Sequence, residues 1–93
     1  MTRIKVRELV WDEWNVEHIK SHNVSQQEVV AITASPIYHK RAHSGRYMLV
    51  GRTGNRIVSV LVRRQEVGIY YIVTARDSDK KERRRVYEKE KRK

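Results

Sequence analysis

Apolar positions follow two different periods, one in the first third of the chain and another in the remainder. In the opening segment RIKVRELVW, Ile4, Val6 and Leu9 alternate loosely with charged residues, which predicts an edge strand. The next stretch, residues 12–35, carries apolar residues at helical spacing and predicts two short helices. We expect Trp11 and Trp14 to pack the first of these helices onto a sheet.

Polar residues mark the ends of both predicted helices. Asp12 is the expected first N-cap, because its carboxylate can accept the free N–H groups of the first turn. Asn23 tolerates the left-handed conformation that follows a helix end. Ser25 and Glu28 have the spacing of a capping box for the second helix, which should end before Pro36. Three apolar residues of that helix are expected to face the core: Val29, Val30 and Ile32.

After the only proline, the pattern changes to β-branched and aromatic runs. IYHKRAH, RYMLVGRT, RIVSVLVRR and IYYIVTAR predict four strands, and TGNR and QEVG supply two of the turns. The last segment, DSDKKERRRVYEKEKRK, returns to helix with Asp77 or Ser78 as its cap. The order β-α-α-β-β-β-β-α predicts a single α+β domain over residues 1–93, with a mostly antiparallel sheet and its helices packed on one side.

Alternation along the strands predicts which side chains share a face. In RYMLVGRT, Arg46, Met48, Val50 and Arg52 are predicted to share one face. In the last strand, alternation predicts that Tyr70, Ile72, Thr74 and Arg76 share one face. The pattern indicates a buried sheet with a basic rim, at which Arg76 is exposed.

Charge is distributed unevenly, and this narrows the choice of partner. The net charge is +10, but the first 36 residues carry four bases and five acids. Residues 37–76 carry eight bases and one acid, and residues 77–93 nine bases and five acids. A polyanion such as nucleic acid is the natural partner of the second half, although an acidic protein would be attracted by the same positive charge.

The composition excludes several classes of site and compartment. The chain has no cysteine, so disulfides and thiolate chemistry are excluded, and a reducing cytoplasm fits. Neither a signal-peptide core nor a membrane-length apolar run is present, so we expect a cytoplasmic protein that does not associate with a membrane.

The last strand exit and the helix after it hold the most informative group of residues. Cleavage of RNA through the 2′-hydroxyl needs a base, cations for the phosphorane and an acid for the leaving oxygen. Glu82 is a candidate base, Arg76 and Arg83 form a candidate phosphate clamp, and Tyr87 is a candidate proton donor or stacking platform. A plainer interpretation is that Glu82 pairs with a neighbouring base and Tyr87 anchors the helix.

A second set of basic residues, interleaved with Tyr47, Tyr70 and Tyr71, predicts a nucleic-acid-binding surface. The alternative is a solvated sheet edge that charge protects against aggregation. The candidates for this surface are Lys40, Arg41, Arg46, Arg52, Arg63 and Arg84.

The four histidines form two pairs with four-residue spacing. His18 and His22 lie in the first predicted helix, and His39 and His43 are expected to share a strand face. Two histidines without a third ligand are a weak metal signal, so neither a metal nor a cofactor is expected. His22 remains a candidate structural or catalytic residue near the helix end.

Taken together, these segments resemble the BrnT toxins of bacterial type II toxin–antitoxin systems, in the wider RelE-like group. The stretches that carry the resemblance are WDEWNVEHIKSHNVSQQEV, GRYMLVGRT and IVTARDSDKKERRRVYE, in the family's order. The resemblance implies a RelE-like fold and a metal-independent endoribonuclease that inhibits growth or translation. It also implies a hetero-oligomer with a BrnA-like antitoxin that neutralises the toxin. The residues that match the family's pattern are His22, Arg46, Arg52, Arg76, Glu82, Arg83 and Tyr87.

The sequence therefore favours an endoribonuclease toxin. The alternative hypotheses are a non-catalytic basic module that binds RNA or DNA and, third, a structural interaction protein. Turnover of RNA separates the first hypothesis from the second.

Overall fold

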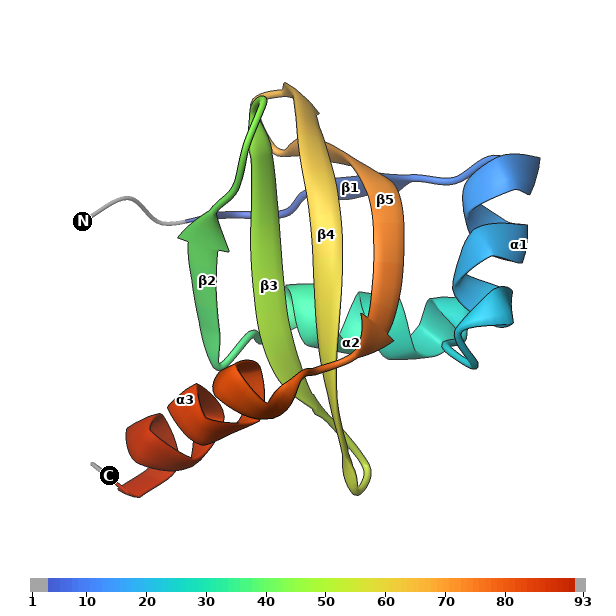
Figure 1. The fold of residues 1–93 in the computed structure, drawn as a ribbon. Helices are drawn as coiled ribbons and strands as arrows, with labels where there is room; N and C mark the ends of the chain where they lie inside the picture. Colours follow the sequence, from blue (N-terminus) through green and yellow to red (C-terminus); the bar gives the residue numbers. More distant parts are fainter. Residues whose placement is uncertain (1–3, 92–93) are drawn as a thin grey trace.

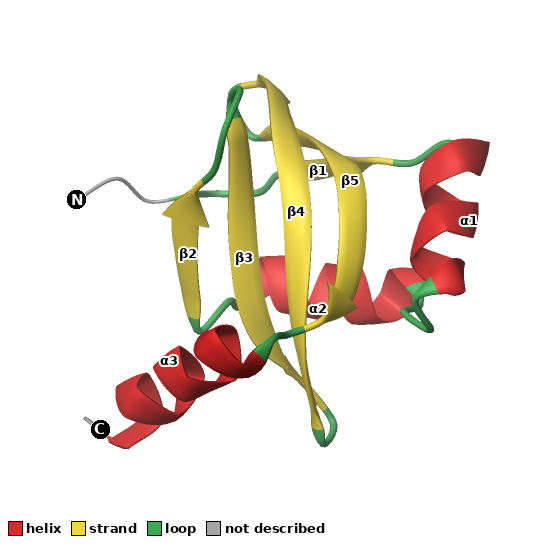
Figure 2. Ribbon diagram, in the orientation of Figure 1, coloured by secondary structure: helices red, strands yellow, loops and turns green. Residues whose placement is uncertain are grey.

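The structure, a computed structural model, describes residues 4–91 and consists of one five-stranded sheet with three helices (Figures 1 and 2). The strand order is β1-β5-β4-β3-β2, with β1 parallel to β5 and every other pair antiparallel. The α+β class, the mostly antiparallel sheet and the element order are confirmed. The elements are β1 (Glu8–Val10), α1 (Glu13–Ser21), α2 (Gln26–Ala34), β2 (Tyr38–Arg41), β3 (Arg46–Thr53), β4 (Arg56–Glu66), β5 (Ile69–Asp77) and α3 (Lys80–Lys91).

The predicted first strand is an edge strand, but it is shorter than the alternating segment. Only Glu8–Val10 pairs with β5. Ile4 and Val6 lie outside the strand, yet they pack against the larger apolar cluster of the core. The alternation therefore indicated burial correctly and strand length incorrectly.

Both N-terminal helices begin and end where the capping residues predicted. Asp12 accepts a hydrogen bond from the Asn15 backbone N–H at 2.8 Å, and Ser25 accepts one from the Glu28 N–H at 3.1 Å. Asn23 adopts the left-handed conformation after α1, with φ 60°. Each cap satisfies N–H groups that the first helical turn leaves without a partner.

Two expectations about apolar burial on these helices are wrong. Trp14 is 57% exposed and stacks on His18 instead of packing on the sheet, and Val30 is 50% exposed. Val29 and Ile32 are fully buried, and Trp11 packs partly buried against the core. Short helices offer a narrow apolar stripe, and Trp14 and Val30 fall outside it.

The helices cover both faces of the sheet, which corrects the expectation that they pack on one side. Helices α1 and α2 pack on the larger cluster, which includes Leu49, Val60 and Ile72. Helix α3 inserts Val86 into a second cluster on the other face, with Met48 and Val50 of β3. Figure 1 shows α2 and α3 on opposite sides of the strands. We call the side that carries α3 the α3 face.

An irregularity in β5 changes the face on which Arg76 lies. Leu61 pairs with Thr74 and Val62 with Ile72, so Val73 is an extra residue in β5. The side-chain alternation is therefore shifted after Val73. Arg76 lies on the α3 face opposite Ser59, and not on the face of Ile72 as unbroken alternation predicted.

No helix within residues 4–91 is long and apolar enough to cross a membrane.

Candidate functional site

A buried carboxylate holds Arg76 at the exit of β5. The Arg76 guanidinium donates from its two terminal nitrogens to the two oxygens of Glu82, at 2.9 and 3.1 Å. The Glu82 side chain is 8% exposed, whereas that of Arg76 is 41% exposed. A third Arg76 bond goes to the Asp77 carbonyl at 3.1 Å, so part of the guanidinium remains available to a ligand.

The position of Glu82 follows from how α3 begins. Asp79 and Glu82 form a capping box, because the Glu82 N–H donates to the Asp79 carboxylate and the Asp79 N–H to the Glu82 carboxylate. Asp79, and not Asp77 or Ser78, is therefore the cap of α3. Ser78 is instead buried, and its hydroxyl lies 2.7 Å from that of Ser59.

These contacts fix the charge state of Glu82. Ser59 also donates to it, at 2.8 Å. Burial opposes ionisation, but the hydrogen bonds from Arg76, the Asp79 N–H and Ser59 outweigh burial and lower the pKa of Glu82 to about 2. A carboxylate of such low basicity is a poor proton acceptor at neutral pH. The sequence suggested Glu82 as the general base. The geometry instead favours a role in which Glu82 positions Arg76.

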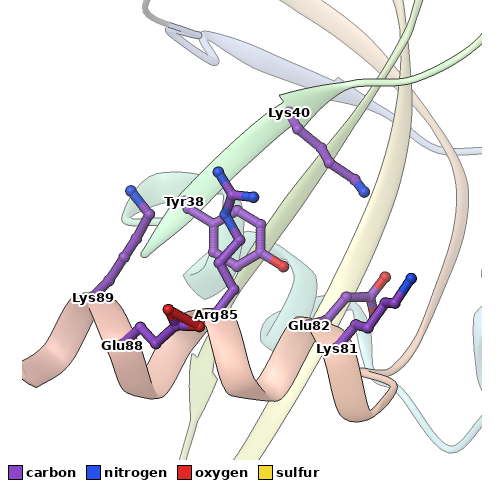
Figure 3. A pocket seen from close by; sticks show the side chains of 7 residues that line it. All are labelled: Tyr38, Lys40, Lys81, Glu82, Arg85, Glu88 and Lys89. Carbon is purple, nitrogen blue, oxygen red and sulfur yellow. The ribbon is translucent and has the colours of Figure 1, made fainter.

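A cavity of about 390 Å³ opens beside this pair, between α3 and β2 (Figure 3). Its lining is predominantly cationic, and its two carboxylates are Glu82 and Glu88. We call it the α3 pocket. The residues that line it are Tyr38, Lys40, Lys81, Glu82, Arg85, Glu88 and Lys89.

Tyr38 forms the inner wall of the α3 pocket. It is 6% exposed, and the Arg85 guanidinium carbon lies 5.2 Å from the centre of its ring. Burial, and then the negative charge of Glu82, raise the pKa of the Tyr38 hydroxyl above its usual value. At neutral pH this phenol therefore keeps its proton and can donate it.

Tyr87 and Arg83, two predicted catalytic residues, lie outside the residues that line the pocket. Tyr87 is 49% exposed, and the guanidinium of Arg52 lies 5.8 Å from its ring centre. Arg52 also makes a two-point ion pair with Glu90, at 2.6 and 3.0 Å. Arg83 donates to the Ser78 carbonyl at 2.6 Å. These contacts hold α3 in place, so the structure brings Glu82 to Arg76 but not Arg83 or Tyr87 to the pocket.

His22 lies away from this group. It is the C-cap of α1 and makes an edge contact with His18, at 5.2 Å between ring centres. Helix α1 packs against the face of the sheet opposite α3. Figure 1 shows α1 and α3 at opposite sides of the molecule. The structure therefore does not bring His22 together with Arg76.

The predicted nucleic-acid-binding residues divide between two faces. Lys40 lines the α3 pocket, and Arg46 and Arg63 pair across β3 and β4 on the same face. Arg41 pairs with Tyr47, which belongs to the opposite face. Arg84 is exposed on α3.

The three predicted tyrosines divide in the same way. Tyr47 and Tyr70 contact each other edge to face and pack in the larger cluster. Tyr71 pairs with Arg63 on the α3 face.

Sequence reasoning missed Tyr38, Ser59 and Arg85. Tyr38 and Ser59 flank Val50 in the sheet, and Arg76 lies next to Ser59. The strand register brings Tyr38, Ser59 and Arg76 together, and this register cannot be predicted from the spacing of residues along the chain. The capping box at Asp79 was a readable signal, because D-x-x-E before a helix fixes where the glutamate lies.

Among residues 4–91 the structure contains no group of three or more histidine, aspartate or glutamate side chains placed to hold a metal ion.

Comparison with known proteins supports the fold. A solved structure of the Brucella abortus ribonuclease toxin BrnT superposes with a TM-score of 0.65 at 17% sequence identity. The match covers 78% of this chain and 97% of that one. The chain thus has a BrnT-like fold, as the sequence resemblance implied. No protein-family model matches the chain, and no curated protein matches it.

Proposed function

We propose that the chain is an endoribonuclease toxin that cleaves RNA without a metal, and that the α3 pocket is its active site. The observation that carries the proposal is the Arg76 guanidinium, held by the buried Glu82 beside a cationic pocket that contains the protonated Tyr38. The fold shared with a ribonuclease toxin supports it. We also propose a cytoplasmic location, where cellular RNA is available as the substrate.

The pocket, together with the Arg76 guanidinium that Glu82 holds beside it, provides the groups that cleavage through the 2′-hydroxyl requires. Arg76, Arg85 and Lys40 provide positive charge for the phosphate, whose negative charge grows in the transition state. The 2′-oxygen attacks phosphorus and gives its proton to Glu88, the second carboxylate of the pocket. The bond from phosphorus to the 5′-oxygen then breaks, and Tyr38 protonates that oxygen. The products are a 2′,3′-cyclic phosphate and a 5′-hydroxyl.

Glu82 has a different role from Glu88 in this scheme. It stays ionised and hydrogen-bonded throughout, because its pKa is about 2. Its function is to orient Arg76. Glu88→Gln should therefore lower the rate by loss of the proton acceptor, whereas Glu82→Gln should lower it by loosening Arg76.

The test is cleavage of bulk RNA in EDTA by the purified chain, with analysis of the product ends. We expect cleavage with cyclic phosphate ends, and a loss of about 10²-fold or more for Tyr38→Phe. Tyr47→Phe is the matched control, because Tyr47 packs on the opposite face. Intact RNA with the folded wild-type chain, together with ordinary RNA binding, would favour the alternative of a non-catalytic binding module.

We also propose an antitoxin partner that covers the basic pocket. The support is the excess of positive charge after residue 36 and the toxin fold. We expect the wild-type chain to arrest growth when it is expressed alone, and co-expression of a BrnA-like antitoxin to relieve the arrest. High-level expression without any effect on growth would contradict the toxin assignment.

A further inference from the structure

We propose that the far end of the α3 face holds a second subsite, built on Arg46 and Arg63, for the backbone of single-stranded RNA. The inference rests on the proposed function and deepens it, because it defines the substrate as a strand that reaches well beyond the cleaved bond. Four observations support it: the register of the sheet, the unpaired Nε of Arg46, the contact of Arg63 with the Tyr71 ring, and the row of residues between the two sites.

The strand register puts the second subsite in line with the pocket. Arg46 pairs with Arg63, and Arg63 pairs with Tyr71, so the three form one row across β3, β4 and β5. Arg76 and Ser59 form a parallel row on the same face. The rows are four residues apart along β4, or roughly 13 Å at the usual rise of a strand.

Arg46 has a buried donor without a partner. Its Nε atom is buried and makes no hydrogen bond to any residue that the structure describes. Buried donors in proteins are nearly always paired, and an unpaired one requires an explanation. The enclosed Nε cannot itself reach an RNA phosphate. A phosphate at this row would be bound through the terminal guanidinium N–H groups of the two arginines, whose planar fork suits phosphate oxygens.

Arg63 is exposed but held in place. Its guanidinium carbon lies 5.0 Å from the centre of the Tyr71 ring, and the Tyr71 hydroxyl donates to Asp12 at 2.8 Å. Tyr71 is thereby fixed at both ends, and Arg63 rests on it as a flat cationic surface. Such a surface can pair with a phosphate or stack under an unpaired base.

The row between the two sites lacks a negative charge, and its two central residues, Met48 and Leu61, are apolar. It consists of Lys40, Met48, Leu61 and Thr74, which pair in sequence across the sheet. Helix α3 crosses only the other end of this face, and Figure 1 shows none of the three helices over the strands above it. A single strand can thus place a base over this row, with one phosphate at Arg76 and another at Arg46 and Arg63.

The test compares two neighbouring arginines that point to opposite faces. Arg63 lies on the α3 face, whereas Arg64 pairs with Tyr70 on the other, and both are exposed. Binding of a labelled single-stranded RNA of about 12 nucleotides, within the usual site size for such grooves, is measured by anisotropy in EDTA. Binding is measured in the Tyr38→Phe background, so that turnover does not interfere.

We expect Arg63→Ala to weaken binding of this strand about 10-fold and to reduce the salt slope by about 1. Arg64→Ala should change affinity less than 2-fold by the same comparison. With the wild-type background, cleavage of a dinucleotide should be the same for Arg63→Ala and the parent, because a dinucleotide is too short to reach the second row.

Equal effects of Arg63→Ala and Arg64→Ala on binding would overturn the subsite, and so would an Arg63→Ala effect on antitoxin binding alone. A loss of dinucleotide cleavage with Arg63→Ala would also overturn it. If no RNA is cleaved at all but the binding difference persists, the subsite stands and the nuclease proposal fails.

Discussion

Two arginine–glutamate pairs connect α3 to the sheet; each has two hydrogen bonds, but their surroundings differ. In the pair Arg52–Glu90, the side chains are 39% and 36% exposed. In the pair Arg76–Glu82, the carboxylate is 8% exposed and also accepts bonds from Ser59 and the Asp79 N–H. Pairing alone does not make a site. Burial and additional donors turn the second pair into a fixed cation beside a pocket.

The difference in burial determines how much each arginine contributes to stability and to the site. An exposed pair gains little, because water screens both charges and each long side chain loses freedom. A buried carboxylate that loses its arginine is left with an uncompensated charge. Arg52 therefore acts as a surface brace, whereas Arg76 combines a structural contact with donors that remain free for a phosphate.

The largest expected effect is that of Arg76→Ala. Loss of a fixed cation at the phosphate should lower the cleavage rate by about 10²–10³-fold. It should also destabilise the fold by roughly 1–3 kcal/mol, because Glu82 stays buried without its main partner. Rates measured on RNA and urea unfolding test the two parts separately. This revises the prediction from the sequence, in which Arg76 is only an exposed residue of a basic rim.

A double substitution separates charge from fold. Arg76→Met with Glu82→Leu removes both charges and should restore most of the stability, because apolar residues of similar size can replace a buried pair. The cleavage rate should stay about 10²–10³-fold below that of the wild type. Full cleavage by this folded double variant would show that the pair is purely structural.

Acid should weaken the fold through Glu82. Its pKa is about 2 in the folded chain and near 4.5 when unfolded, so its contribution is fully present above about pH 5 and is lost as the pH falls toward 2. The contribution is on the order of 3 kcal/mol. Unfolding free energies of the wild type and Glu82→Gln should converge across this window. If the unfolding free energies of the two proteins changed in parallel with pH, Glu82 would not be the group with the lowered pKa.

Ser59→Ala should have an intermediate effect. It removes one donor to Glu82 and the contact with Ser78, both buried, and should cost about 1–2 kcal/mol. The rate of the folded protein should fall less than for Arg76→Ala, because the arginine pair remains. Thermal unfolding of Ser59→Ala beside Ser25→Ala, a cap far from the site, gives the comparison.

The sequence contained most of the local structure and only part of the site. Caps at Asp12 and Ser25, and the hairpins and order of the strands, follow from short-range chemistry. The exposure of Trp14 and Val30 does not follow from it, because it depends on how short helices dock.

The site depended on two features that no period along the chain contains. The extra residue Val73 moves Arg76 to the α3 face, and the register of β2 brings Tyr38 beside it. The sequence around Glu82 was enough to identify it as a candidate site residue. Its role could be inferred only from its hydrogen bonds in the structure.

The smallest expected effect is that of Arg52→Ala. Its stability change should stay within about 0.5–1 kcal/mol, and it should shrink further in salt because the pair with Glu90 is exposed. Urea unfolding at low and high salt measures it. A loss as large as that of Arg76→Ala would remove the contrast between the two pairs.

The most direct test makes the same conservative change at both pairs. Lysine keeps the charge but lacks the planar fork, so Arg76→Lys should fold, bind RNA and cleave it about 10²-fold more slowly. Arg52→Lys should cleave within about 3-fold of the wild type, because its pair lies outside the pocket. Equal cleavage rates for the two folded variants would contradict the assignment of the α3 pocket and Arg76 as the site of RNA cleavage.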